Sequence, residues 1–198
     1  MIDDLIVELD PPTNRRSKCN GHVERHLTGA AVMLAYGLHL LETVKQLDTV
    51  ELHPDGEHAK RFEIAKWLSR RGFKLAEGWG TTTYCGRYVL GGKQILIRST
   101  PGLGDVVAIF QSGSIVAECK GGIVNTRHAG QQSRLRKGLC EAVGLLMART
   151  KTGRQVAVVP YTDPTLRLAQ KMAARAMAAG IEIALVDEHG HVIDVRPG

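Results

Sequence analysis

Three residues of the chain, Asp105, Glu118 and Lys120, have side chains that together suit the hydrolysis of phosphodiester bonds. Asp105 precedes a short apolar run, VVAIF, and a turn joins that run to IVAECKGG, which contains the other two residues. Because side chains two apart on a strand leave the same face of a sheet, Glu118 and Lys120 are expected to point the same way. A hairpin between the two runs would bring Asp105 beside them.

These residue types predict metal-assisted chemistry. Magnesium prefers carboxylate oxygens as ligands, and Asp105 and Glu118 would supply a pair. A bound cation polarises the scissile phosphate, while Lys120 can orient the attacking water or offset negative charge in the transition state. The alternative is a purely structural Glu–Lys pair. The apolar surroundings favour the site, because unpaired charge in a buried strand is costly.

On these residues the chain resembles the PD-(D/E)xK nuclease superfamily, with its restriction-endonuclease-like fold, and especially the Mrr-like and Holliday-junction-resolvase-like branches. Asp105 matches the isolated Asp of the motif, and Glu118-Cys119-Lys120 matches its ExK element. The resemblance spans about residues 57–195. It implies Mg²⁺ as cofactor, with Mn²⁺ able to substitute, held by Asp105, Glu118 and the backbone carbonyl of Cys119.

The resemblance also implies two further catalytic residues. An acidic residue from the helix before the sheet corresponds to Glu63, with Glu57 as the alternative. A Gln or basic residue on the helix after ExK corresponds to Gln131. Gly104 stands where the name of the motif has Pro, a departure that the two branches share. The neighbours of Gln131 that could take its role are Gln132, His128 and Arg134.

Hydrophobic periodicity indicates the elements that must position these residues. A nearly apolar helix is expected from about His22 to Leu47, and a second helix should end at Gly72. The predicted fold is α/β, a restriction-endonuclease-like αβββαβ core with a mixed central sheet and an added N-terminal helix. The remaining elements are a β-meander of strands at 93–98, 106–110 and 115–119, a helix to about Arg149, a strand at 155–159, a helix at 163–179 and strands at 181–186 and 191–195.

Two units are expected along the chain. Residues 1–50 would form an arm and an apolar helix with an accessory or dimerisation role, and residues 51–198 the nuclease-like domain. The stretch from Leu27 to Leu41 is apolar on nearly all sides, so it predicts a helix packed against a second copy or across the core of its own chain. A homodimer, or a place in a larger complex, would let two sites cut two strands.

The charge suits a nucleic-acid partner. The formal net charge is +6, which attracts a polyanion by counterion release. The residues expected to contact DNA phosphates are Arg127, His128, Arg134 and Lys137, with a solvated helix face as the alternative. DNA is the expected substrate and RNA is not excluded, in restriction and defence or in repair and recombination. The rival hypothesis is a non-catalytic DNA-binding or assembly subunit that retains the fold.

The remaining sequence features favour a cytoplasmic protein. The four cysteines lack paired spacing, as is typical of reduced thiols. The acidic N-terminus does not resemble a signal peptide, and the apolar stretch is too short for a membrane span. Zinc binding by Cys19, His22, His26 and Cys85 is the weaker interpretation, because the sequence has no second paired cluster.

Overall fold

The chain folds into an α/β structure with a mixed sheet, as its sequence predicts, and helices lie on both faces of that sheet. The computed structural model describes residues 5–10, 23–54, 62–80, 82–151 and 153–198. Its helices are α1 (Gly29–Thr43), α3 (Ile64–Arg70), α4 (Ala129–Ala148) and α5 (Asp163–Ala178). From one edge to the other, the large sheet contains β12 (Val192–Val195), β11 (Ile181–Val186), β10 (Arg154–Pro160), β8 (Gly113–Cys119), β7 (Val106–Phe110), β3 (Thr49–Leu52), β6 (Lys93–Ile97), β5 (Gly86–Leu90) and β4 (Lys74–Gly78). A small sheet is formed by β1 (Ile6–Leu9), β2 (Glu24–Leu27) and β9 (Gly122–Ile123).

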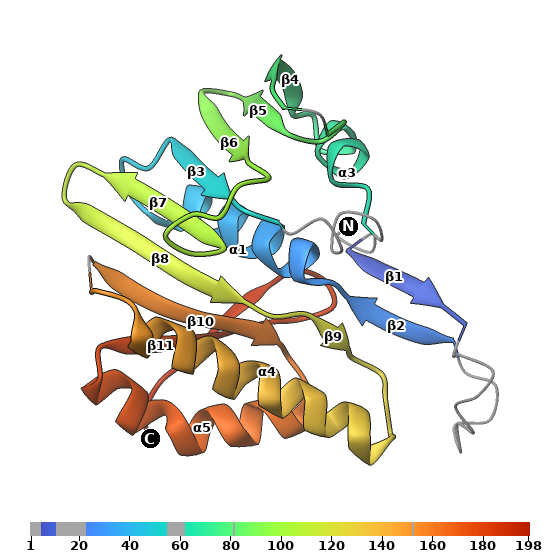
Figure 1. The fold of residues 1–198 in the computed structure, drawn as a ribbon, viewed down its shortest axis with the longest axis vertical. Coiled ribbons are helices and arrows are strands. Elements are labelled where there is room, and N and C mark those ends of the chain that lie inside the picture. The colour runs from blue at the N-terminus through green and yellow to red at the C-terminus, as the bar shows by residue number, and fades with distance from the viewer. Residues whose placement is uncertain (1–4, 11–22, 55–61, 81, 152) are drawn as a thin grey trace.

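Different helices cover the two faces of the large sheet. α1 packs on one face, and α4 and α5 pack together on the other, over β8, β10 and β11 (Figure 1). The side chains of β8 alternate between the two cores: Ile115, Ala117 and Cys119 belong to the α1 side, and Val116 belongs to the α4 side. This alternation decides which face each charged residue of β8 occupies.

α1 differs from the predicted N-terminal helix at both ends and in its surroundings. It begins after Thr28, whose side chain accepts a hydrogen bond from the backbone N–H of Ala31 at 3.2 Å, and it ends at Thr43. Such an N-cap satisfies a free helix N–H, and the residues before it form β2 instead, so the predicted start near His22 is wrong. Most residues of α1 are buried against strands of the same chain, and the helix therefore offers no free apolar face for a dimer.

The predicted β-meander is wrong in one respect. β7 and β8 pair antiparallel as expected, but β3 lies between β6 and β7, parallel to β6 and antiparallel to β7. The sequence of β3, TVEL, has only four residues and follows the apolar helix closely, so it carries little periodic signal of its own. β3 also spans the boundary that was predicted between residues 1–50 and 51–198. α1, which lies before that boundary, shares a core with strands that lie after it.

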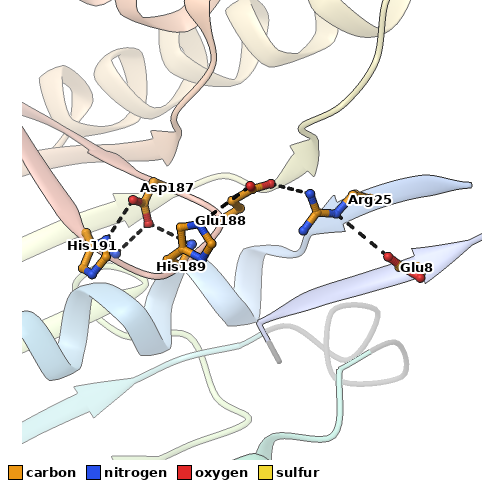
Figure 2. Close-up of polar contacts among 6 residues, drawn as sticks. All are labelled: Glu8, Arg25, Asp187, Glu188, His189 and His191. Atoms are coloured by element: carbon orange, nitrogen blue, oxygen red, sulfur yellow. Dashed lines mark hydrogen bonds and ion pairs between the residues drawn. The ribbon is translucent and has the colours of Figure 1, made fainter. Parts of the chain in front are cut away.

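Ion pairs tie the small sheet to the turn between β11 and β12. Arg25 on β2 donates to the Glu188 carboxylate at 2.7 Å and lies 4.0 Å from that of Glu8 on β1 (Figure 2). In the turn, Asp187 accepts hydrogen bonds from the backbone N–H groups of His189 and His191. The N-terminal residues expected to form a loose arm thus include a paired strand, β1.

Most of the other predicted elements are confirmed. The strands at 93–98, 106–110, 115–119, 155–159, 181–186 and 191–195 and the helix at 163–179 match observed elements to within two residues. The second helix ends at Arg70, within two residues of the predicted Gly72, and most of the N-terminal arm lies outside the described residues. No helix in the described ranges is long and apolar enough to span a membrane.

Candidate active site

Asp105 and Glu118 lie opposite each other on the α4 face of the large sheet. The β7–β8 register pairs Val106 with Ala117, and one step further it aligns Asp105 with Glu118. The Asp105 carboxylate accepts a hydrogen bond of 2.8 Å from the backbone N–H of Cys119, which fixes its orientation across the two strands. The hairpin predicted from the sequence therefore brings the two carboxylates together.

The Glu118 side chain is buried, with 3% of its surface exposed, and it contacts an arginine. Its Oε1 accepts a hydrogen bond of 2.5 Å from the guanidinium of Arg149, which follows α4 directly. Burial raises the pKa of the Glu118 carboxyl above its ordinary value, and the negative charge of Asp105 adds to that rise. Arg149 and Lys120 oppose the rise without cancelling it.

Lys120 lies on the same face and pairs with a carboxylate of α4. Its Nζ is 2.9 Å from Oε1 of Glu141. A Cβ at Gly138 would lie 3.3 Å from the Lys120 Cβ, so the absence of a side chain at Gly138 lets the helix cross close to the lysine. Burial lowers the Lys120 pKa, but the hydrogen bond to Glu141 and the nearby carboxylates outweigh it, and the net pKa is raised. The ammonium is therefore charged at neutral pH.

A histidine that the sequence patterns did not indicate, His53, lies beside Asp105 at the end of the neighbouring strand. His53 directly follows β3 and donates its backbone N–H to the Asp105 carbonyl at 2.9 Å. Its Nδ1 lies 2.6 Å from the carbonyl oxygen of Thr100, and its Nε2 lies 3.4 Å from the Glu51 carboxylate. A Cβ at Gly102 would overlap the imidazole ring, so the loop passes directly over it. His53 thus anchors the loop that leads into Asp105.

The glycine that replaces the Pro of the motif has a steric reason in this structure. A Cβ at Gly104 would lie 2.6 Å from Cγ1 of Val116 and 2.9 Å from the carbonyl oxygen of Ala117. Distances of that size are shorter than van der Waals contact, so a larger residue would push β7 away from β8. Gly104 therefore permits the close approach that aligns Asp105 with Glu118.

The donor set suits a hard divalent cation. Two carboxylates from neighbouring strands share one face, and the charge of one disfavours ionisation of the other, a repulsion that a bound cation would relieve. The Cys119 thiol is buried in the core on the α1 side and burial raises its pKa, so only the backbone carbonyl of Cys119 stays a predicted ligand. Among the described residues, no three His, Cys, Asp or Glu side chains form a metal-binding group.

The structure does not bring Glu63 to these residues. It precedes α3, is exposed, and pairs with Lys66 at 2.8 Å, which lowers its pKa. The buried residues of α3 pack into the core on the α1 side, whereas the Asp105–Glu118 pair lies on the α4 side. Glu63 as a catalytic residue therefore rests on the resemblance alone, because the structure places it away from the carboxylate pair. The alternative, Glu57, lies outside the described residues.

Gln131 lies on the helix after ExK, but near the end that is remote from Lys120. It is buried in the first turn of α4, seven residues before the position at which Gly138 meets Lys120, or about 10 Å along the helix. It lines a cavity of about 540 Å³ between α4 and the small sheet. The other polar residues of that cavity are Asp10, Glu24, His26 and Arg134, and Glu24 and His26 contact each other at 3.1 Å.

The basic residues predicted to contact DNA are exposed around the N-terminal half of α4. Arg127 and His128 precede the helix, with His128 at its N-cap, and Arg134 and Lys137 lie on it. Lys137 is adjacent to Gly138, which contacts Lys120. A polyanion bound along these residues would therefore pass close to the carboxylate pair.

The position of α4 brings Arg149 and Glu141 to the site, where they contact Glu118 and Lys120. Glu141 and Leu145 lie four residues apart on one side of α4, and Arg149 follows at the same step directly after the helix. The four-residue spacing is visible in the sequence, but basic residues on a helix are typical of a solvated face. No sequence pattern near Arg149 indicates that this side of the helix contacts Glu118. Cys140 and Cys85 are free thiols outside the site.

Comparison of the chain with profiles of protein families, with curated proteins and with solved structures finds no match.

Proposed function

We propose that the chain is a magnesium-dependent nuclease that hydrolyses DNA phosphodiester bonds, with Asp105, Glu118 and Lys120 at its active site. The observation that carries the proposal is the Glu118 carboxylate, buried and aligned with Asp105 on the sheet face that also presents Lys120. Burial and the charge of Asp105 raise the pKa of Glu118 although Arg149 pairs with it, and a carboxyl perturbed in this way beside a second carboxylate favours a functional role.

The topology supports the restriction-endonuclease-like reading of the fold. α1, β3, β7, β8, α4 and β10 follow one another in an αβββαβ order, and the four strands are neighbours in the sheet. β8 and β10 are parallel, whereas β3, β7 and β8 alternate in direction. In this interpretation α1 is the first helix of the core, and α3, β4, β5 and β6 form an insertion between β3 and β7.

The chain's own residues have separable tasks in the proposed reaction. Asp105, oriented by the Cys119 N–H, and Glu118 would hold Mg²⁺, with Mn²⁺ as a substitute. When bound, the cation would polarise the scissile phosphate and favour hydroxide as the nucleophile. The charged Lys120 would orient the attacking water or stabilise the added negative charge of the phosphorus centre. The exposed basic residues at α4 would hold the phosphate backbone.

A cleavage screen tests the proposal. The purified protein is incubated with linear, supercoiled, single-stranded and branched DNA and with RNA, in Mg²⁺, Mn²⁺ or a chelator. Metal-dependent cleavage of DNA that the Glu118→Gln variant lacks is the expected result. Binding without cleavage on every substrate would favour the rival, a non-catalytic DNA-binding or assembly subunit, and cleavage of RNA alone would change the substrate class.

We propose further that the protein acts on two strands as a homodimer or within a larger complex. One carboxylate pair hydrolyses one strand, so a double-strand break needs two sites or two binding events. Light scattering with and without a short duplex measures the state directly. A protein mass of 21.6 kDa under both conditions, after subtraction of the mass of any bound duplex, would contradict a dimer of any geometry.

A further inference from the structure

The contact between Arg149 and Glu118 places a protein cation where the proposed metal ligand is buried. The 2.5 Å hydrogen bond joins the guanidinium to Oε1 of Glu118, whose side chain is only 3% exposed. Lys120, the other cation near Glu118, is paired with Glu141 instead. Arg149 is thus the positively charged group that contacts this carboxylate directly.

Arg149 also lies at the edge of the packed structure, at the end of α4. Arg149 is the C-cap residue of α4, and 36% of its side chain is exposed. Its guanidinium can therefore turn into solvent without disturbing the helix or the two cores. A planar guanidinium also binds phosphate well, since it offers two parallel N–H donors.

From this geometry we infer that Arg149 competes with the metal for Glu118, and that the guanidinium, once displaced, binds a phosphate of the substrate. The inference rests on the proposed nuclease function. A divalent cation beside Glu118 repels the adjacent guanidinium, because two positive charges within a few ångströms in a partly buried site are poorly screened. A phosphate at the rim of the site attracts the same group.

The two ligands are therefore coupled through one side chain. Any phosphate that draws Arg149 away from Glu118 favours metal binding, and by thermodynamic linkage the metal favours phosphate binding to the same degree. The free protein would bind metal weakly and the DNA-bound protein would bind it well. Because of this coupling, the metal-bound active site forms mainly when substrate is present.

The test uses Mn²⁺ binding to the DNA-free protein, followed by the electron paramagnetic resonance signal of free Mn²⁺. Arg149→Gln keeps an N–H donor for Glu118 but removes the charge. We expect it to bind Mn²⁺ about fivefold more tightly than the wild type, the change that corresponds to losing one partly exposed ion pair. Arg149→Lys should give an intermediate affinity, and Arg175→Gln, the same charge change on an exposed residue of α5, should leave the affinity unchanged.

DNA affinity provides the second measurement. The anisotropy of a labelled duplex is compared in a chelator and in Ca²⁺, which takes the same oxygen ligands as Mg²⁺. Ca²⁺ should raise the DNA affinity of the wild type, and Arg149→Gln should lose most of that gain. Unchanged Mn²⁺ affinity in Arg149→Gln, with binding still abolished by Asp105→Asn, would overturn the inference alone. Absence of Mn²⁺ binding in both the wild type and Arg149→Gln would overturn the proposed metal site itself.

Discussion

The Asp105 carboxylate accepts a hydrogen bond from the backbone N–H of Cys119, so one metal-ligand candidate is fixed by the strand that carries the other. The bond crosses from the residue before β7 to the end of β8 at 2.8 Å. It gives Asp105 a structural role beside the proposed catalytic one. The two roles can be separated by substitution.

Asp105→Asn should abolish cleavage and leave the fold intact. The amide oxygen can still accept from Cys119, but it lacks the charge that a metal ligand needs. Asp105→Ala should abolish cleavage and also lower the free energy of unfolding by about 1–3 kcal/mol, because a hydrogen bond to a charged group is lost. Cleavage assays and urea unfolding measure the two effects. Glu63→Gln, the same chemical change at the exposed residue outside the site, should cleave normally. Cleavage by pure Asp105→Asn would remove Asp105 from the active site.

Glu118→Gln should lose cleavage while gaining stability at neutral pH. The pKa of Glu118 is raised in the folded protein, first by burial and then by Asp105, so folding favours its protonated form. Ionisation of Glu118 therefore costs stability as pH rises from about 4.5 through its folded pKa. Urea unfolding from pH 4.5 to 8 should show an advantage of Glu118→Gln over wild type that grows across this window. The exposed Glu42→Gln serves as the control and should show no such trend. An advantage that shrinks as pH rises would contradict the prediction.

Gly104→Ala should destabilise the protein and impair cleavage together. The added methyl meets Val116 and the Ala117 carbonyl at less than 3.0 Å, so the end of β7 and Asp105 must shift. Overpacking of this kind costs about 1–3 kcal/mol. Gly144→Ala is the matched control: nothing lies within 4 Å of its Cβ, and alanine in a helix should stabilise by about 0.5–1 kcal/mol. Thermal unfolding and cleavage rates measure both variants, and equal behaviour of the two would argue against tight packing at Gly104.

Neutralising Arg134 and Lys137 together should weaken DNA binding at every sequence. If each contacts one phosphate, the slope of log affinity against log salt should fall by about 0.9 per residue. Arg167→Gln with Lys171→Gln removes the same charge from exposed positions on α5 and should change affinity little. Fluorescence anisotropy between 50 and 300 mM salt, concentrations chosen to span the range over which counterion release dominates, reports the slope. An unchanged slope would contradict DNA contact by these two residues and favour a solvated helix face.

Local sequence was sufficient to predict those elements whose hydrophobic residues follow a regular short-range pattern. The alternation in VVAIF and IVAEC identified β7 and β8, and the turn between them made the hairpin the natural pairing. That hairpin alone aligns Asp105 with Glu118 and places Lys120 on the same face. The α/β class followed from the same patterns.

The tertiary structure decided what comes from distant parts of the chain. β3 lies between β6 and β7, which brings His53 beside Asp105, and α3 packs on the α1 side with Glu63 away from the carboxylate pair. Arg149 reached Glu118 because α4 runs back across β8 and ends there. A strand of four residues has too few positions for its alternation to specify a partner, and the pairing energy depends on neighbours that are remote in sequence. Periodicity therefore identified the longer elements and their faces, whereas the contacts of the site depended on how those elements pack.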